Sequence, residues 1–408
     1  MKRWGALGQG LVLGALVGVA CGVASAIFLL LLEVVTHVRV HDERWVYGLP
    51  VAGLVLGLVY ERFGAKIKAG TDLIIDTIHD GGPELPLRMA PMVLLGTVTA
   101  HLFGASVGRE GTAVQMGASL SDWISHRLRL GPELRVQLLA AGVAGGFGAV
   151  FGTPIAGAIF GLEFTGAKPS QPGRLKYEAL VPALVAAVVG DLTTRALGVT
   201  HARYPVVPHL DLSALLVGKW IIFAVAVALV TAVFIELVHF LKKQGERRIP
   251  RLSVRMFLGG AVVVALWKLV GTSDYLGLGI PTILRAFEDP SLPLAVFALK
   301  LIFTAVCLGA GFPGGEVTPL FFIGAALGSV LAQVLGIPVV LGAGVGMAAV
   351  FAAASNAPLA LSIMAVELLG VGILPHVAIV AVLAYVLTGH RSIYSAQLSS
   401  LSRGSGSG

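Results

Sequence analysis

The sequence predicts an all-α polytopic membrane protein, made of two repeats with broken and re-entrant helices. The 408 residues are 56% hydrophobic and only 12% charged, whereas an ordinary soluble domain carries roughly 25% charged residues. Apolar runs recur along the whole chain. Two short glutamate-bearing segments interrupt these runs at similar places in the two halves.

The apolar runs differ in length, and their lengths predict their geometry. The first, Leu11–Leu32, is long enough to cross a bilayer and is followed by more runs, so it predicts a membrane helix rather than a signal peptide. Several later runs are too short to cross about 30 Å of hydrocarbon. They predict tilted, broken or re-entrant helices packed inside protein. These later runs are Leu49–Tyr60, Met89–Phe103, Leu138–Phe160, Ala179–Val189, Leu215–Phe240, Phe257–Val270, Leu294–Leu308, Leu320–Leu335, Val339–Leu369 and Val377–Leu387.

The net charge of +7 raises the question of a nucleic-acid partner, and the places of the basic residues argue against one. A group of them shares one loop between apolar runs: Lys242, Lys243, Arg247, Arg248, Arg251 and Arg255. With Lys2 and Arg3, this loop fits the positive-inside pattern, which places both in the cytoplasm. We therefore expect membrane lipid, and no nucleic acid, as a partner.

Polar residues recur at matching places in the two halves. Glu110 and Glu316 are 206 positions apart, and each is followed two residues later by a threonine. Duplicated halves with interrupted hydrophobic segments are typical of transporters built from repeats. The sequence thus predicts a first membrane repeat over 1–200 and a second over 201–398. Residues 399–408 read as a polar tail, either disordered or left from cloning.

A second match supports the duplication. Pro154 is followed nine residues later by Glu163, and Pro358 is followed nine residues later by Glu367. Because polar residues rather than apolar ones carry the match, chance similarity between apolar runs explains it poorly.

Glu110 lies in the segment Gly108-Arg109-Glu110-Gly111-Thr112, at the start of an apolar run. An ionisable residue inside a membrane is costly and is a functional candidate, and a helix N-terminus there attracts anions. If the helix begins near Gly111, the carboxylate competes with a transported anion for the N–H groups around Gly108, Arg109 and Gly111. It would then plug the route and leave on protonation. The alternative is a structural glutamate paired with Arg109, a side chain that we expect to face carbonyls or headgroups.

Glu316 lies in Gly314-Gly315-Glu316-Val317-Thr318-Pro319. A second carboxylate at ~4 Å would repel an anion by about 4 kcal/mol at an effective dielectric constant of 20. Burial that favours the neutral acid removes this repulsion and leaves a hydrogen-bond donor, and loss of its proton would couple anion to proton movement. The alternative is a carboxylate that caps the following helix. Thr318 adds a hydroxyl.

Four further side chains are candidates for the anion route, each with a structural alternative. The ring edges of Phe321 and Phe322 carry partial positive charge that suits an anion, or the rings simply pack. Thr71 offers a hydroxyl or an N-cap. Tyr394 offers a hydroxyl or, as the sequence alone favours, an interfacial anchor. The sequence shows no nucleophile–base pair and no metal-ligand spacing, so we expect no enzyme, no cofactor and no metal.

Together these segments resemble the CLC family of chloride channels and transporters, from about residue 10 to Tyr394. The segment 108–112 is similar to the GREGP signature of that family, with threonine in place of proline. Residues 315–319 stand at the place of GxFxP, and Gly70-Thr71-Asp72-Leu73 replaces GSGIP. The resemblance implies a homodimer with one pore per subunit, inverted halves and Glu110 as the gating glutamate.

The variants GREGT and GEVTP are characteristic of the bacterial fluoride branch of that family, whose members exchange fluoride for protons. Glu316, Thr318 and Tyr394 match that branch, and Phe164 stands where some exchangers carry an internal proton-transfer glutamate. The resemblance implies a fluoride/proton antiporter of the bacterial inner membrane. A passive anion channel and a chloride- or nitrate-proton exchanger of the same fold are the alternatives.

Overall fold

The computed structural model describes residues 2–82, 84–165 and 174–397, and over these ranges the chain forms helices and one isolated bridge. Within the described residues, 8 helices are long and apolar enough to cross a membrane. The predicted all-α membrane fold is therefore confirmed, while residues 398–408, with the predicted tail, lie outside the described residues.

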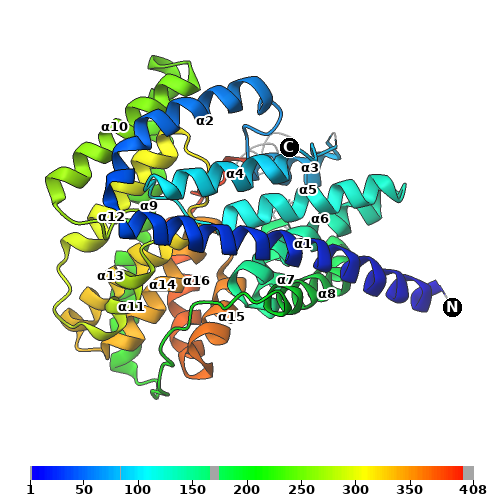
Figure 1. The fold of residues 1–408 in the computed structure, drawn as a ribbon. Coiled ribbons are helices and arrows are strands. Elements are labelled where there is room, and N and C mark those ends of the chain that lie inside the picture. The colour runs from blue at the N-terminus through cyan, green and yellow to red at the C-terminus, as the bar shows by residue number, and fades with distance from the viewer. Residues whose placement is uncertain (1, 83, 166–173, 398–408) are drawn as a thin grey trace, which may run out of the picture.

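The helices pack around a buried apolar core (Figure 1). Their bounds are α1 (Lys2–His41), η1 (Glu43–Gly48), α2 (Leu49–Phe63), α3 (Thr71–Asp80), α4 (Met89–Leu102), α5 (Glu110–Arg127), α6 (Pro132–Phe151), α7 (Pro154–Thr165), α8 (Arg174–Ala196), α9 (Ala214–Arg248), α10 (Leu252–Val270), α11 (Ile280–Glu288), α12 (Ala295–Ala310), α13 (Val317–Leu335), α14 (Val339–Ser355), α15 (Pro358–Leu369), η2 (Val371–Ile373) and α16 (Leu374–Thr388).

Two long apolar runs of the sequence are broken at matching places. The run 138–160 ends its first helix at Gly152, in the left-handed conformation, and restarts at Pro154. The run 339–369 does the same at Asn356, also left-handed, and restarts at Pro358. Proline fits the first turn of a helix, and a residue in the left-handed conformation commonly ends one. The residues at these two positions therefore determine both breaks.

The two halves meet where α5 and α13 begin. Gly108 donates its N–H to the Gly315 carbonyl at 2.5 Å, and Gly315 donates its own to the Gly108 carbonyl at 2.7 Å. A Cβ added to Gly315 would lie 2.6 Å from the Gly111 nitrogen, so only glycine allows the two backbones to approach this closely. The segments before both helices thus face each other across one exchanged pair of hydrogen bonds.

A second exchange links α7 and α15. The carboxylate of Glu367, near the end of α15, accepts the N–H groups of Ile155 and Ala156 at 3.0 and 2.7 Å. In return, the carboxylate of Glu163, near the end of α7, accepts those of Leu359 and Ala360 at 3.2 and 2.8 Å. Carboxylates stabilise the free N–H groups at helix N-termini.

The residues matched in sequence therefore make matching contacts in the fold. Each half offers the other the contact that it receives, as expected of two copies related by a two-fold axis. The repeat boundaries at 200 and 201 stay a prediction.

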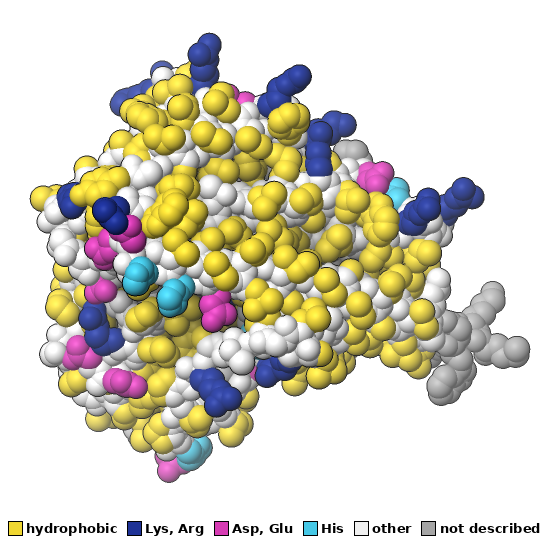
Figure 2. All heavy atoms as spheres, viewed as in Figure 1, with side chains coloured by type: hydrophobic (Ala, Val, Ile, Leu, Met, Phe, Trp, Pro, Cys, Tyr) yellow, Lys and Arg dark blue, Asp and Glu magenta, His cyan; other side chains and the backbone are white. Residues whose placement is uncertain are grey.

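The surface agrees with a membrane setting. Figure 2 shows one face covered largely by hydrophobic side chains, with the Lys and Arg side chains gathered towards its edges. Exposed apolar side chains follow the long helices, such as Val12 on α1 at 70% and Leu229 on α9 at 65% exposure. Such a belt is costly in water and suits hydrocarbon.

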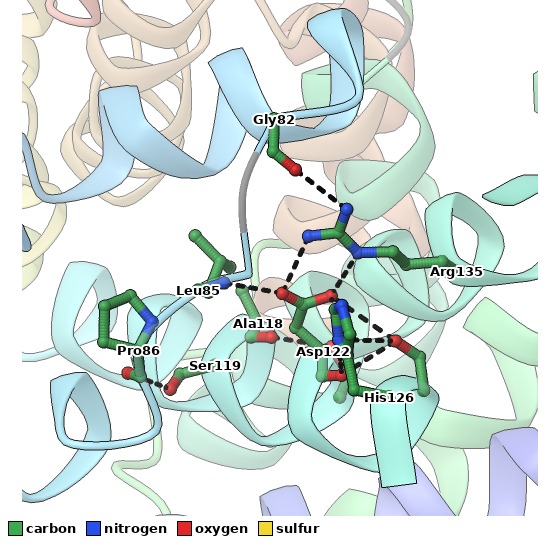
Figure 3. Close-up of polar contacts among 10 residues, drawn as sticks. Gly82, Leu85, Pro86, Ala118, Ser119, Asp122, His126 and Arg135 are labelled. Atoms are coloured by element: carbon green, nitrogen blue, oxygen red, sulfur yellow. Dashed lines mark hydrogen bonds and ion pairs between the residues drawn. The ribbon is translucent and has the colours of Figure 1, made fainter. Parts of the chain in front are cut away.

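The C-terminal part of α5 is held by a buried ion pair (Figure 3). Asp122, fully buried, receives Arg135 Nε from α6 at 2.6 Å and Nη2 at 3.0 Å. Its other contacts include the Leu85 N–H at 2.7 Å, and Arg135 reaches the Gly82 carbonyl at 2.9 Å. This network joins α5, α6 and the segment before α4, so it fixes the helix whose other end carries Glu110.

We expect Asp122→Ala to lower the thermal unfolding midpoint of the detergent-solubilised protein by several degrees. Removing one member of a buried pair leaves an uncompensated charge, at a cost of roughly 3–5 kcal/mol. Glu236→Ala is the matched control, because Glu236 pairs with Arg391 at 3.0 Å while its side chain is 63% exposed; exposed pairs contribute roughly 0–1 kcal/mol. Equal shifts for both variants, followed by thermal melting, would contradict the role given to Asp122.

Candidate functional site

The Glu110 carboxylate sits at the N-terminus of the opposite half's helix, α13. Oε1 accepts the Thr318 hydroxyl at 2.5 Å, and Oε2 accepts the Thr318 N–H and the Arg109 N–H, each at 3.1 Å. Glu110 is fully buried. Charge-assisted bonds of this kind are the strong ones, and the dipole of α13 adds to them. A carboxylate held this way occupies a site made for an anion.

The donors differ in part from those predicted. The Gly108 N–H is taken by Gly315, so the prediction that it faces an anion is wrong for this conformation. Gly111 lies against Gly315, and the Arg109 N–H binds the glutamate itself. The sequence places Glu110 on α5, but it could not show that the carboxylate crosses to Thr318, because that contact joins residues 208 positions apart.

The Arg109 side chain is also placed differently. Its Nε lies 3.4 Å from Glu110 Oε1, and the side chain is 15% exposed. The ion pair considered as a structural alternative therefore exists beside the Thr318 bonds, while the expectation that Arg109 also faces carbonyls or headgroups stays a prediction. A cation at this point stabilises the ionised carboxylate in its place on α13.

Glu316 is paired with Tyr394. It is 8% exposed, it precedes α13 without capping it through its side chain, and its Oε1 accepts the Tyr394 hydroxyl. Two of the structural alternatives thus fail, because the carboxylate of Glu316 makes no capping hydrogen bond to α13 and the buried phenol of Tyr394 is not an interfacial anchor. A phenol–carboxyl pair is a built-in donor and acceptor next to the start of α13.

Tyr394 is held by the segment around it. Its N–H donates to the Ser392 hydroxyl at 3.1 Å, and the Ala396 N–H donates to the Asp72 carboxylate at 3.0 Å. Gln397 Nε2 donates to the Ser355 carbonyl at 3.2 Å. The bond to Asp72 holds the C-terminal end of the described chain against α3. This placement could not be predicted from the sequence, since Asp72 and Ser355 are each more than 40 residues from the groups that they bind.

A cavity of about 570 Å³ opens onto this pair, and we call it the inner cavity. It is lined among others by Thr71, Asp72, Lys242, Glu316 and Tyr394. The basic residues predicted to share one loop lie instead at the end of α9 and the start of α10. Because Lys242 is one of them, the positive-inside pattern places this cavity on the cytoplasmic side.

Thr71 lies in the wall of the inner cavity. It is the first residue of α3, after the N-cap Gly70, and its hydroxyl accepts Gln115 Nε2 at 3.2 Å. It is therefore not the cap that we considered. Its place among the cavity-lining residues leaves the predicted hydroxyl role open.

The two phenylalanines are buried and pack against other side chains. Phe321 packs against Phe151 at 5.3 Å and Phe351 at 5.9 Å. Phe322 carries the ammonium of Lys300 over its ring, 5.2 Å from the centroid. Neither lines the cavities, so packing explains both rings here, and an anion-facing role stays a prediction.

Lys300 is a buried charge that the sequence analysis missed. Its Nζ donates to the carbonyls of Tyr275 and Gly277 at 3.1 and 2.7 Å, and the residue is fully buried. The signal was present, because a lysine inside the apolar run 294–308 is as unusual as a glutamate. Among the described residues, no group of three or more His, Cys, Asp or Glu side chains could hold a metal ion.

Comparison with known proteins decides the family. The model of the family described as "Voltage gated chloride channel" matches residues 52–389. The chain belongs to the CLC family. It is 46% identical over 401 residues to the "Chloride/fluoride channel protein" of Pseudomonas syringae pv. tomato, covering 95% of this chain and 86% of that protein. Membership of this family makes it a multi-pass membrane protein and a transport protein rather than an enzyme.

Solved structures of the family have the same fold. A CLC-type fluoride/proton antiporter superposes with a TM-score of 0.91 at 32% identity, over 96% of this chain and 98% of that chain. A slow cyanobacterial Cl⁻/H⁺ antiporter superposes with a TM-score of 0.83 at 20% identity, over 96% and 97%. The CLC fold predicted from the motifs is thereby confirmed.

Proposed function

We propose that this CLC protein is a fluoride/proton antiporter that exports fluoride from the cytoplasm in exchange for protons. The observation that carries the proposal is the Glu110 carboxylate on the first turn of α13, bound by the Thr318 hydroxyl and N–H. The 46% identical relative, a "Chloride/fluoride channel protein", and the similar CLC-type fluoride/proton antiporter support the choice of ion.

The site suits a small, strongly hydrated anion. Fluoride loses tightly held water on entering, so it needs several strong donors in a small space. When Glu110 leaves, the Thr318 hydroxyl and N–H and the Arg109 N–H are free together. Buried donors without partners are costly, so an anion that replaces the carboxylate is stabilised where it sits. Chloride, being larger, gains less from so dense a set.

Proton coupling follows from the same competition. The ionised carboxylate of Glu110 blocks the site, while protonation weakens its charge-assisted bonds and releases it. Fluoride and the ionised glutamate therefore exclude each other, and each fluoride that passes requires a proton on Glu110. This exclusion is the physical basis of exchange.

We assign the inner proton step to Glu316. The position taken by Phe164 holds no acid; the ring stacks on Phe160 at 5.2 Å and meets Tyr394 edge-on at 5.1 Å. Glu316 borders the inner cavity and lies close to Gly111, the residue after Glu110. A carboxyl group between the inner cavity and Gly111 can pass a proton towards Glu110. The hydrogen bond from the Tyr394 hydroxyl stabilises the charged form of this carboxyl.

The channel alternative is tested by the reversal potential of the purified protein in a planar bilayer. The 46% identical relative is named a channel protein, and this name favours the channel alternative. With fluoride equal on both sides, a pH difference of one unit should shift the reversal potential of an antiporter. A reversal potential that stays at zero would identify a passive channel. Efflux of fluoride and chloride from matched proteoliposomes then ranks the two anions.

We also propose, from the family resemblance, that two copies pair as a homodimer with one route in each. The molecular mass of the protein in detergent, measured by light scattering, should correspond to two chains. A mass of one chain would contradict the pairing.

A further inference from the structure

A second cavity of about 520 Å³ lies at the other end of the molecule, and we call it the outer cavity. The segment 199–204 lines much of it, together with Phe151, Gly152, Arg195, Glu367 and Leu368. This segment precedes α9, and Lys242 near the far end of α9 lines the inner cavity. The two cavities therefore open towards opposite sides of the membrane.

One wall of the outer cavity packs against α13, the helix that binds the Glu110 carboxylate. Phe151 lines the cavity and packs against Phe321, three residues after Thr318 on α13, with ring centroids 5.3 Å apart. The side chain of Arg109, which pairs with Glu110, is 15% exposed. Phe151 and Phe321 thus connect the wall of the outer cavity to α13, the helix whose first turn holds the Glu110 carboxylate.

Tyr204 brings a phenol into this cavity. Its ring packs against Phe287 at 6.2 Å, while over residues 2–82, 84–165 and 174–397 its hydroxyl makes no hydrogen bond. Burial raises the pKa of Tyr204 to about 12, with Arg109 lowering it and Glu110 raising it through their charges. The phenol therefore stays a neutral donor at physiological pH, within the field of the gating pair.

Some of the cationic side chains of the outer cavity have an ion-pair partner and one has none among the described residues. Asp191 binds Arg195 Nε at 2.8 Å and lies 3.2 Å from His201 Nε2. Arg203 is exposed and forms no ion pair with any described residue. One free guanidinium and one free hydroxyl therefore share the outer cavity, and this pair is suited to a small anion.

The geometry points to an outer anion site in which the Tyr204 hydroxyl binds fluoride on the outer side of Glu110. This inference rests on the proposed function and extends it. Each cavity then has its own phenol: Tyr394, bound to Glu316, lines the inner cavity, and Tyr204 lines the outer cavity. A hydroxyl at this place binds the ion as it leaves the α13 site, or the ion about to enter it from outside.

The test compares the two faces of the membrane separately. Right-side-out vesicles expose the outer cavity to the bath, and everted vesicles expose the inner cavity. In both, fluoride uptake is driven by an acidic lumen and followed with a fluoride electrode. Tyr204→Phe keeps the ring against Phe287, so we expect an unchanged melting temperature and an apparent KM at least fivefold higher in right-side-out vesicles. In everted vesicles the apparent KM should stay within twofold.

The matched control is Tyr47→Phe, which also removes one phenol hydroxyl. Tyr47 is 50% exposed and packs on Trp267, away from both cavities, so its apparent KM should not change on either face. An unchanged KM for Tyr204→Phe in right-side-out vesicles would overturn the outer site. An equal rise on both faces would overturn it as well, because it would indicate a general loss of transport.

Failure of the proposed function gives a different result. If the unmodified protein shows no proton-coupled fluoride flux, fluoride binding is measured by calorimetry in the Glu110→Gln background. There, Tyr204→Phe should weaken fluoride binding at least fivefold. Identical titrations with tyrosine and phenylalanine at 204 would reject the outer site, whatever the transport cycle.

Discussion

Replacing Glu110 with glutamine should leave a protein that moves fluoride without moving protons. Glutamine keeps the size of the side chain and an acceptor for the Thr318 N–H, but it has no charge to compete with fluoride and no proton to exchange. The reversal potential of Glu110→Gln should follow the fluoride gradient alone and become insensitive to pH. Paired fluoride and pH electrodes on proteoliposomes measure both fluxes at once.

The control for this experiment is Glu133→Gln. Glu133 lies exposed in the first turn of α6, so the same chemical change there should leave fluoride and proton fluxes coupled as before. Proton movement that persists unchanged in Glu110→Gln would remove the gating role from this residue. The buried Asp122–Arg135 pair at the other end of α5 is untouched, so the fold should be retained.

Replacing Glu316 with alanine should reduce fluoride transport at least tenfold while the protein still inserts and melts cooperatively. The change removes the carboxyl that accepts the Tyr394 hydroxyl and the acid that we assign to the inner proton step. A hydrogen bond to a charged group contributes roughly 1.5–3 kcal/mol, about a tenfold change or more. Initial efflux rates from proteoliposomes, with protein amounts matched on gels, measure the effect.

Glu246→Ala separates this role from a general effect of charge. Glu246 lines the same inner cavity, but its side chain is 45% exposed. Its Oε1 forms a long ion pair with Arg255 Nη2, at 3.9 Å. Its loss should change the efflux rate less than twofold. Equal losses in the two variants would mean that the cavity needs any negative charge rather than the carboxyl beside Tyr394.

The sequence was sufficient to find the acidic residues of the site. Glu110 and Glu316 stand out because carboxyls are rare in apolar chains, and glycines and threonines beside both suggest helix starts. The breaks before α7 and α15 are equally local, since proline and a left-handed residue mark each one. Features that depend on a few neighbouring residues can be predicted in this way.

The partners of these residues could not be predicted. Glu110 binds Thr318, and Glu163 and Glu367 cap each other's helices across about 200 residues. No local rule selects such contacts, because they depend on how two whole halves pack. Tyr394 shows the same limit: near the end of an apolar run a tyrosine favours the interface, and here hydrogen bonds to distant residues draw it inside.

The exchanged bonds between Gly108 and Gly315 limit how this protein can work. Both backbones are fastened to each other beside the ion route, and neither can retreat without leaving two polar groups unpaired in a water-poor interior. A cycle in which the halves rock apart would have to break this fastening on every turnover. Alternating exposure should therefore arise from swinging side chains within a nearly rigid frame.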